Sequence, residues 1–182
     1  FMRYYADQAT TLHSKVTQRG TTGEDNILEY YPKGLVVCIS PWNFPLAITM
    51  GQIAAALVTG NTVLAKPSEH TSLIGYMAVS LFFDHGLPPD ALHFLPGDGK
   101  LGQAIISSQH IDLVVFTGSF KTAKKIQQTL SDKPGKIVPL IAETSGLNSM
   151  VVDSSALVER ACDDIIRTAF NSAGQRCSAL RL

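Results

Sequence analysis

The sequence predicts an α/β fold in which an open, doubly wound parallel sheet is covered by helices on both faces. Two observations lead to this fold class. From Gly34 onward, short runs rich in Val, Ile and Leu alternate with segments of helix length. Most of these runs are apolar at consecutive positions, which is typical of parallel strands that are buried on both faces. Strand–helix alternation of this kind is the pattern of open α/β domains.

The first 33 residues do not share this alternation, and we assign them to a separate N-terminal segment. Residues 1–15 carry apolar side chains at helical spacing and predict a helix. Residues 17–33 are polar and contain turn-forming residues such as Gly23, and they predict a hairpin that ends near Tyr31.

The elements of the α/β part follow one another between residues 34 and 173. Predicted strands cover 35–39, 61–65, 92–95, 113–116, 137–141 and 150–152. Predicted helices cover 46–58, 71–85, 101–107, 121–130 and 155–173. Pro45 suits the start of a helix, where the first N–H groups have no partner within the helix. Gly60 and Gly86 follow helical runs and suit the left-handed residue that ends many helices.

Composition excludes several classes of function. Lysine plus arginine and aspartate plus glutamate number 15 each, so the basic excess of a nucleic-acid binder is absent. The longest apolar stretches, 34–39 and 53–58, are too short to cross a bilayer. Three widely spaced cysteines suit neither a disulfide scaffold nor a zinc site, which predicts a cytoplasmic protein without a metal. Because the sequence begins within a predicted helix and stops in an apolar run, we expect it to be part of a longer protein.

Polar and glycine-containing segments follow most of the predicted strands. In an open α/β sheet, ligands bind beyond the carboxyl ends of the strands, so these segments are the candidate site. They cover residues 40–45, 66–69, 96–99, 117–119 and 143–146.

Together with the Gly-Gln-Arg-Cys run at 174–177, these segments resemble the aldehyde dehydrogenase superfamily. The Pro-Trp-Asn-Phe-Pro, Lys-Pro-Ser-Glu, Phe-Thr-Gly-Ser and Glu-Thr-Ser-Gly motifs occur in the order of that family. The separation of 34 residues between Glu143 and Cys177 also matches. Ser145 departs from the pattern, since most members have glycine there. The runs 37–47 and 172–181 are most similar to the pyrroline-5-carboxylate dehydrogenase of bifunctional proline utilization A proteins.

This resemblance implies a Rossmann-like NAD-binding domain at 34–173 and the start of the catalytic domain at 174–182. It implies NAD-dependent oxidation of an aldehyde, most closely glutamate γ-semialdehyde to glutamate in proline catabolism. The resembled proteins are homo-oligomers, and some are fused to a proline dehydrogenase domain. Since most of a catalytic domain would lie outside this stretch, we expect the isolated chain to be inactive.

Three residues carry the chemistry that the resemblance implies: Cys177 as nucleophile, Asn43 as oxyanion donor and Glu143 as general base. Each also has a simpler interpretation from the sequence alone. A lone cysteine is more often a small packing residue, Asn43 could cap the following helix, and Glu143 could be an exposed loop carboxylate. Because Glu143 ends an apolar strand, we expect it to be partly desolvated. Cys38 and Cys162 lie in apolar or helical runs and are interpreted as packing residues.

The cofactor contacts implied by the resemblance lie at the strand ends. Lys66 and Glu69 resemble the pair that binds the adenosine ribose, where a carboxylate disfavours the 2′-phosphate of NADP. Ser119 resembles the pyrophosphate contact at a helix N-terminus, and Gly99 allows close backbone approach. The other implied contacts are Ile39, Ser40, Pro41, Trp42, Ser68 and Gly118.

Two implied substrate contacts, Phe44 and Ser178, complete the prediction; Phe44 alone could equally be a packing residue. Two alternatives to glutamate semialdehyde oxidation stay open. The protein could oxidise a different semialdehyde, or the chain by itself could be a non-catalytic nucleotide-binding module.

Overall fold

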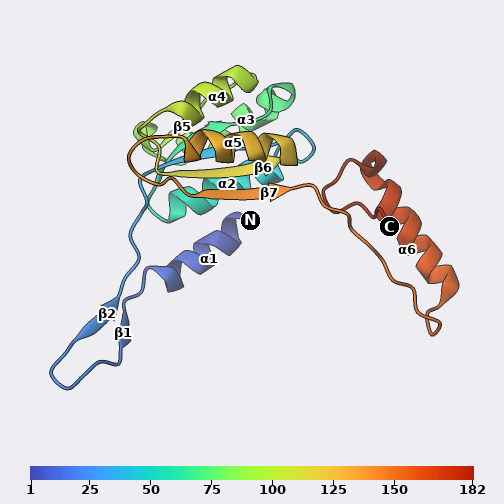
Figure 1. The fold of residues 1–182 in the computed structure, drawn as a ribbon, viewed down its shortest axis with the longest axis horizontal. Helices are drawn as coiled ribbons and strands as arrows, with labels where there is room; N and C mark the ends of the chain where they lie inside the picture. The colour runs from blue at the N-terminus through green and yellow to red at the C-terminus, as the bar shows by residue number, and fades with distance from the viewer.

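The computed structural model describes residues 1–182 and contains six α-helices and two β-sheets (Figure 1). The elements before residue 70 are α1 (Met2–Leu12), β1 (Val16–Gln18), β2 (Asn26–Leu28), β3 (Leu35–Ile39), α2 (Ala47–Val58) and β4 (Thr62–Lys66). The later elements are α3 (Ser72–Asp84), β5 (Leu92–Phe94), α4 (Gly99–Ser107), β6 (Leu113–Gly118), α5 (Phe120–Ser131), β7 (Leu140–Thr144) and α6 (Val158–Phe170). Short 3-10 turns occupy Glu69–Thr71, Pro89–Ala91 and Asn171–Gly174.

The larger sheet has five parallel strands in the order β5-β4-β3-β6-β7, as the α/β prediction requires. The chain runs outward from β3 to β5, then crosses back to place β6 on the other side of β3. The order of strands therefore reverses between β3 and β6. At such a switch point, the loops that follow the two strands diverge and leave a crevice for a ligand.

Helices cover both faces of this sheet, and each face has its own core. Successive residues of a strand point to opposite faces, so Val36 and Cys38 pack toward α2 and α3 while Val37 packs toward α4 and α5. The first core also contains Ile53, Val63, Val79 and Leu92. The second core contains Ile106, Ile111, Val114, Phe116, Ile126 and Leu130. Burial on both faces explains why the strands are apolar at consecutive positions.

The last strand begins later than the sequence predicts, at Leu140 rather than at residue 137. Pro139 has no N–H to donate to a sheet, and only its carbonyl takes part, accepting from the N–H of Val114 at 3.0 Å. Ile137, expected within the strand, is 95% exposed. The apolar run is thus split by the proline, and its first residues lie outside the sheet.

Two further boundaries differ from the prediction. Residues 150–152 form no strand: the segment lies outside the sheet, and Val151 is 91% exposed. The helix expected at 155–173 is α6 alone, because Ser172 and Ala173 have positive φ angles of 54°. L-residues in that left-handed region do not continue an α-helix.

The β1–β2 hairpin and the C-terminal region with α6 extend away from the sheet (Figure 1). α1 packs on α2, and β1 and β2 form the predicted antiparallel hairpin. α6 lies apart from the sheet at the other end and buries none of its residues. None of the helices is both long enough and apolar enough to span a membrane.

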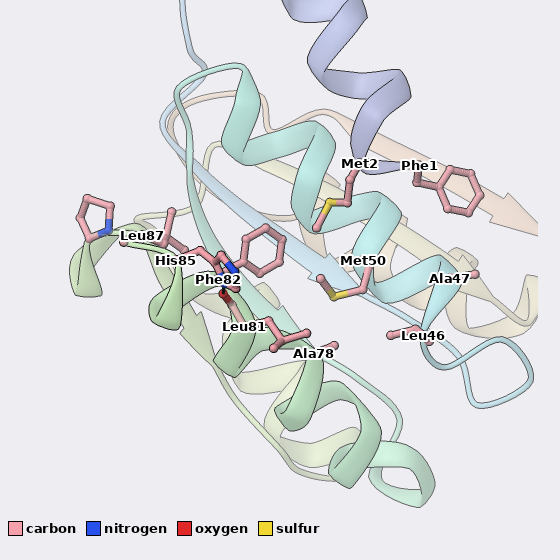
Figure 2. Close-up of a pocket in the computed structure, with 12 residues that line it drawn as sticks. Phe1, Met2, Leu46, Ala47, Met50, Ala78, Leu81, Phe82, His85 and Leu87 are labelled. Carbon is pink, nitrogen blue, oxygen red and sulfur yellow. Dashed lines mark hydrogen bonds between the residues drawn. The ribbon is translucent and has the colours of Figure 1, made fainter.

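An apolar groove lies between α1, α2 and the end of α3 (Figure 2). It has a volume of about 810 Å³. Met2 and Met50 point into it from α1 and α2, and Leu81 and Phe82 line it from α3. None of the predicted site residues lines this groove.

Candidate active site

One cavity brings together the three residues predicted to carry the chemistry. Asn43, Glu143 and Cys177 all line a cavity of about 530 Å³ at the carboxyl end of the sheet. They come from the loop after β3, from β7 and from the segment after α6. The cavity lies at the switch point between β3 and β6, where the fold predicts a ligand. Its other lining residues include Pro41, Trp42, Ile48, Thr117, Gly118, Ser119, Thr144, Gln175 and Arg181.

Asn43 contacts the segment that carries Cys177. Its Nδ2 donates to the backbone oxygen of Gln175 at 3.1 Å. It does not cap α2, whose N-cap is Leu46 with no side-chain hydrogen bond. An amide group has two N–H bonds, so the second one is left for another acceptor in the cavity.

The backbone before Cys177 has an uncommon conformation. Ser172, Ala173 and Gly174 have φ angles of 54°, 54° and 67°, three consecutive left-handed residues. This turn reverses the chain at the end of α6 and directs it toward the sheet. Non-glycine residues in this region store strain and persist only where surrounding contacts hold them, which is frequent at functional sites.

Asn148 holds the Cys177 segment on its other side. Its Nδ2 donates to the backbone oxygens of Cys177, at 2.6 Å, and of Ala179, at 2.9 Å. The backbone carbonyl of Asn148 accepts from the backbone N–H of Arg181 at 2.9 Å. The Cys177 side chain is exposed, and its backbone N–H makes no hydrogen bond within the chain.

Arg176, the residue before Cys177, also lines this cavity, but its guanidinium is bonded to the end of α6. Its guanidinium donates to the carbonyl of Asn171 at 3.0 Å and to that of Thr168. It thus satisfies carbonyls that the helix end leaves without partners.

The other two cysteines differ from each other. Cys38 is buried in β3, and burial raises the pKa of its thiol to about 12, so it is unreactive near neutrality. Cys162 is exposed on α6, so its interpretation as a packing residue is wrong. Cys162 is exposed because no other element packs over α6.

Glu143 is paired with Thr117 of β6 in the sheet register. It also lines a second, smaller cavity of about 370 Å³ that Gln52 shares. Its side chain is exposed, so the partial desolvation expected from its apolar strand is not found. β7 is the edge strand of the sheet, with no further strand beyond it.

A third cavity, of about 530 Å³, lies between α4 and α5 and contains the predicted ribose pair. Lys66 is buried, and its Nζ donates to the carbonyl of Pro67 at 3.2 Å. Burial lowers the pKa of this ammonium, while the nearby charges of Glu69 and Asp98 oppose the shift. Ile39, Gly99, Lys100, Gln103 and Lys125 also line this cavity.

The N-terminus of α5 is capped by a residue of the predicted site. The Ser119 hydroxyl accepts from the N–H of Thr122 at 3.2 Å. Gly118, just before it, is required sterically, because a Cβ there would lie 2.6 Å from the ring of Phe116. At Gly99 a Cβ would meet open space, so no neighbour within the chain requires glycine there.

Four predicted contacts do not lie in these cavities. The Ser40 hydroxyl is buried and bonded to that of Thr49 at 2.6 Å, so it has a structural partner. The Ser68 hydroxyl caps the turn that contains Glu69. Phe44 and Ser178 line neither the cavity of Cys177 nor the one between α4 and α5.

Two residues of the site were not predicted, Asn148 and Gln52, whereas Thr117 lies in the predicted segment 117–119 without an assigned role. Asn148 and Gln52 act through hydrogen bonds to residues 13 or more positions away, and no local pattern indicates such contacts.

Comparison with known proteins identifies the same family that the motifs resemble. The sequence matches the profile of the aldehyde dehydrogenase family over residues 1–182. It is 51% identical over 185 residues to the bifunctional protein PutA of Rhizobium meliloti. That alignment covers 100% of this chain and 14% of the relative.

Solved structures agree with the fold. A proline utilization A (PutA) variant from Bradyrhizobium japonicum has a TM-score of 0.95 at 50% identity and covers 98% of this chain. The 1-pyrroline-5-carboxylate dehydrogenase of Thermus, with bound NAD, has a TM-score of 0.91 at 32% identity and also covers 98%. The chain spans 19% and 36% of these two proteins, so it corresponds to a minor part of each.

Proposed function

The chain belongs to the aldehyde dehydrogenase family, and from this premise we propose that it supplies the cofactor-binding region and nucleophile of an NAD-dependent aldehyde dehydrogenase. The resemblance found in its motifs is thereby confirmed at the level of the family. One observation carries the proposal: three separate segments bring Cys177, Asn43 and Glu143 to a single cavity.

Cys177 begins the reaction. Its thiolate adds to the carbonyl carbon of the aldehyde, and the carbonyl oxygen becomes a negatively charged oxyanion. Two donors are free to bind this oxygen: the second amide N–H of Asn43 and the unbonded backbone N–H of Cys177. NAD, held by the residues assigned below, would accept the hydride that leaves the same carbon, and Cys177 would then carry a thioester.

Glu143 completes the cycle. Its carboxylate takes a proton from water, and the resulting hydroxide attacks the thioester carbonyl. The bond from carbon to sulfur breaks, the carboxylic acid is released and the thiolate of Cys177 is restored. The exposed position of Glu143 gives water direct access to this base.

The chain offers surfaces that fit NAD. We assign the adenosine ribose to Lys66 and Glu69 in the cavity between α4 and α5. The pyrophosphate would lie at Ser119 and the N-terminus of α5, where backbone N–H groups and the helix dipole favour an anion. Gly118 keeps this approach free of a side chain. Ile39 lines the cavity between α4 and α5, and Pro41 and Trp42 line the cavity of Cys177.

For the substrate we propose glutamate γ-semialdehyde, the open form of pyrroline-5-carboxylate. The support is the similarity to PutA and to 1-pyrroline-5-carboxylate dehydrogenase over the length of this chain. On the same ground we propose a homo-oligomeric, cytoplasmic protein, fused to a proline dehydrogenase domain as in the bifunctional relatives.

The test is the activity of the full-length protein on a panel of aldehydes. We expect kcat/KM for glutamate semialdehyde to exceed that for succinate semialdehyde and propanal by about tenfold or more, roughly 1.4 kcal/mol of transition-state stabilisation. Cys177→Ala should abolish turnover and leave NAD binding intact. Cys162→Ala, the other exposed cysteine, is the matched control and should retain activity. A higher kcat/KM for another aldehyde would replace the proposed substrate, and turnover of Cys177→Ala within tenfold of wild type would exclude the nucleophile.

Cofactor choice tests the ribose contact separately. With Glu69 beside the ribose, kcat/KM should be greater with NAD than with NADP, because the carboxylate repels the 2′-phosphate. Glu69→Gln removes that charge and should narrow the preference by about tenfold, roughly 1.4 kcal/mol. Equal values for both cofactors in the wild-type protein would contradict this role.

A further inference from the structure

Gln52 bridges the ends of the two strands that border the switch point. Its Nε2 donates to the carbonyl of Ile39, the last residue of β3, at 3.3 Å, and to Oγ1 of Thr117 in β6 at 3.0 Å. Gln52 lies in α2, the helix that follows the Asn43 loop. One side chain therefore connects β3, β6 and the helix that supports the oxyanion donor.

The orientation of this amide is fixed by its partners. The Ile39 carbonyl can only accept, so the nitrogen and not the oxygen of Gln52 must face it. Thr117 accepts from the same nitrogen and keeps its own hydroxyl proton for another acceptor. Oε1 of Gln52 is buried and has no hydrogen-bond partner. Burying an acceptor without a partner costs free energy. The two hydrogen bonds of Nε2 offset that cost and hold the side chain in this orientation.

Thr117 connects Gln52 to the chemistry. It lines the cavity of Cys177 and Asn43, and also the smaller cavity that contains Gln52 and Glu143. In the sheet register it is the direct partner of Glu143. A shift of the end of β6 would therefore move both the Glu143 strand end and the start of α5.

We propose that Gln52 is a positioning residue for aldehyde oxidation. Through Ile39 and Thr117 it holds the Asn43 loop and the Glu143 strand end in one arrangement, without contacting the reacting atoms itself. This inference rests on the proposed function, but the bridge can be measured without any aldehyde.

The first measurement is amide hydrogen exchange in the full-length protein. Gln52→Met keeps the length and volume of the side chain and removes both hydrogen bonds. We expect exchange to accelerate by about tenfold in residues 39–43 and 116–119, with little change elsewhere. Gln128→Met is the matched control, because Gln128 is exposed on α5 and donates only to Asp132. Unchanged exchange at both strand ends would overturn the proposal.

The second measurement separates positioning from cofactor binding. Gln52→Met should lower kcat by about tenfold or more, since small displacements of reacting groups are costly, while KM for NAD changes by less than about threefold. A loss confined to KM for NAD, with kcat unchanged, would overturn the proposal.

The third measurement is a dependence on pH that a packing defect would not produce. In Gln52→Glu, the protonated carboxyl has one O–H to donate, but the ionised form has none. The ratio of variant to wild-type kcat should fall by about tenfold as pH rises through the pKa of that carboxyl, which burial raises above about 4.3. For Gln52→Met the ratio should be independent of pH.

The outcomes distinguish this inference from the proposed function. If wild-type protein oxidises no aldehyde, the proposed function and the reaction role of Gln52 both fail, and exchange alone reports the bridge. If wild-type protein is active and the Gln52→Glu ratio is flat with pH, the proposed function stands and the positioning role is wrong.

Discussion

α5 and α6 are nearly equal in length, with 12 and 13 residues, and both carry apolar side chains on one side. α5 packs on the sheet and buries Ala123, Ile126 and Leu130. α6 lies apart from the sheet, and its Ile166 and Phe170 are 60% and 72% exposed (Figure 1). The same kind of pattern thus gives a packed helix in one region and an uncovered one in the other.

The difference separates the two halves of the candidate site. The cofactor side is built from β3, β4, β6 and the helices that cover them, and its side chains are fixed by two buried cores. The nucleophile side reaches the sheet through hydrogen bonds, chiefly those of Asn43 and Asn148. The first half is positioned by packing, and the second by a few polar contacts.

The largest expected effect concerns the 182-residue chain by itself, which should oxidise no aldehyde. Cys177 and Glu143 are exposed and α6 is uncovered, whereas catalysis needs a preorganised site that excludes bulk water. NADH formation from glutamate semialdehyde, compared between this chain and the full-length protein, measures the effect. Steady NADH formation by the chain alone, lost in Cys177→Ala, would contradict this prediction and show that an uncovered α6 does not prevent catalysis.

Asn43→Ala should have the next largest effect, because it removes both the proposed oxyanion donor and the contact with Gln175. In the full-length protein we expect kcat to fall about 100- to 1000-fold, roughly 3 to 4 kcal/mol. Binding of NAD, followed by titration calorimetry, should change little. A fall in kcat below about tenfold would mean that Asn43 serves the fold and not the reaction.

A pair of isoleucine substitutions compares the two regions directly. Ile126→Ala on α5 leaves a cavity in a buried core and should cost about 2 to 5 kcal/mol of unfolding free energy. Ile166→Ala on α6 alters an exposed side chain and should cost less than about 0.5 kcal/mol in this chain. Urea denaturation of the two variants measures both values. Equal costs would show that α6 is packed in solution.

The smallest effect depends on pH. The hydrogen bond from Lys136, followed by that from the backbone N–H of Leu35, holds the pKa of Asp112 below its usual 3.8. Because the pKa of Asp112 is lower in the folded than in the unfolded protein, its ionised form stabilises the fold at pH values above the usual 3.8. That stabilisation is lost as pH falls through the pKa of the folded state. Asp112→Asn should therefore cost about 1 to 2 kcal/mol at neutral pH and progressively less below pH 3.8.

Urea denaturation as a function of pH measures this cost. Asp132→Asn at the exposed end of α5 is the control, with an expected change below about 0.5 kcal/mol. A cost for Asp112→Asn that stays constant from neutral to acid pH would assign the effect to side-chain shape instead of charge.

The sequence predicts the sheet region well because its signals are local. Each strand there is a short apolar run with a helix beside it, and glycine or proline marks many of the boundaries. The error at β7 has a local cause as well, since Pro139 excludes residues 137–138 from the strand. The segment 150–152 has the composition of a strand, but its pairing with a neighbouring segment is limited to the hydrogen bond from the N–H of Met150 to the carbonyl of Leu182, and composition does not report that.

The site was predictable in identity but less so in arrangement. Motif order located Cys177, Asn43 and Glu143, which do share a cavity. Tertiary contacts decide the hydrogen bonds between Ser40 and Thr49, between Arg176 and the end of α6, and between Asn148 and Cys177. The same limit applies to Cys162, whose exposure follows from the absence of a layer over α6.

The hydrogen bond between Asn43 and Gln175 spans 132 positions of sequence. Contacts of such separation close a long loop, and their entropy cost delays them until local structure has formed. Synthesis from the N-terminus adds to this order, because the strands and helices of the sheet leave the ribosome before Cys177 does. The thiol of Cys177 is therefore among the last parts of the site to be made and to be placed, on a sheet that is already folded.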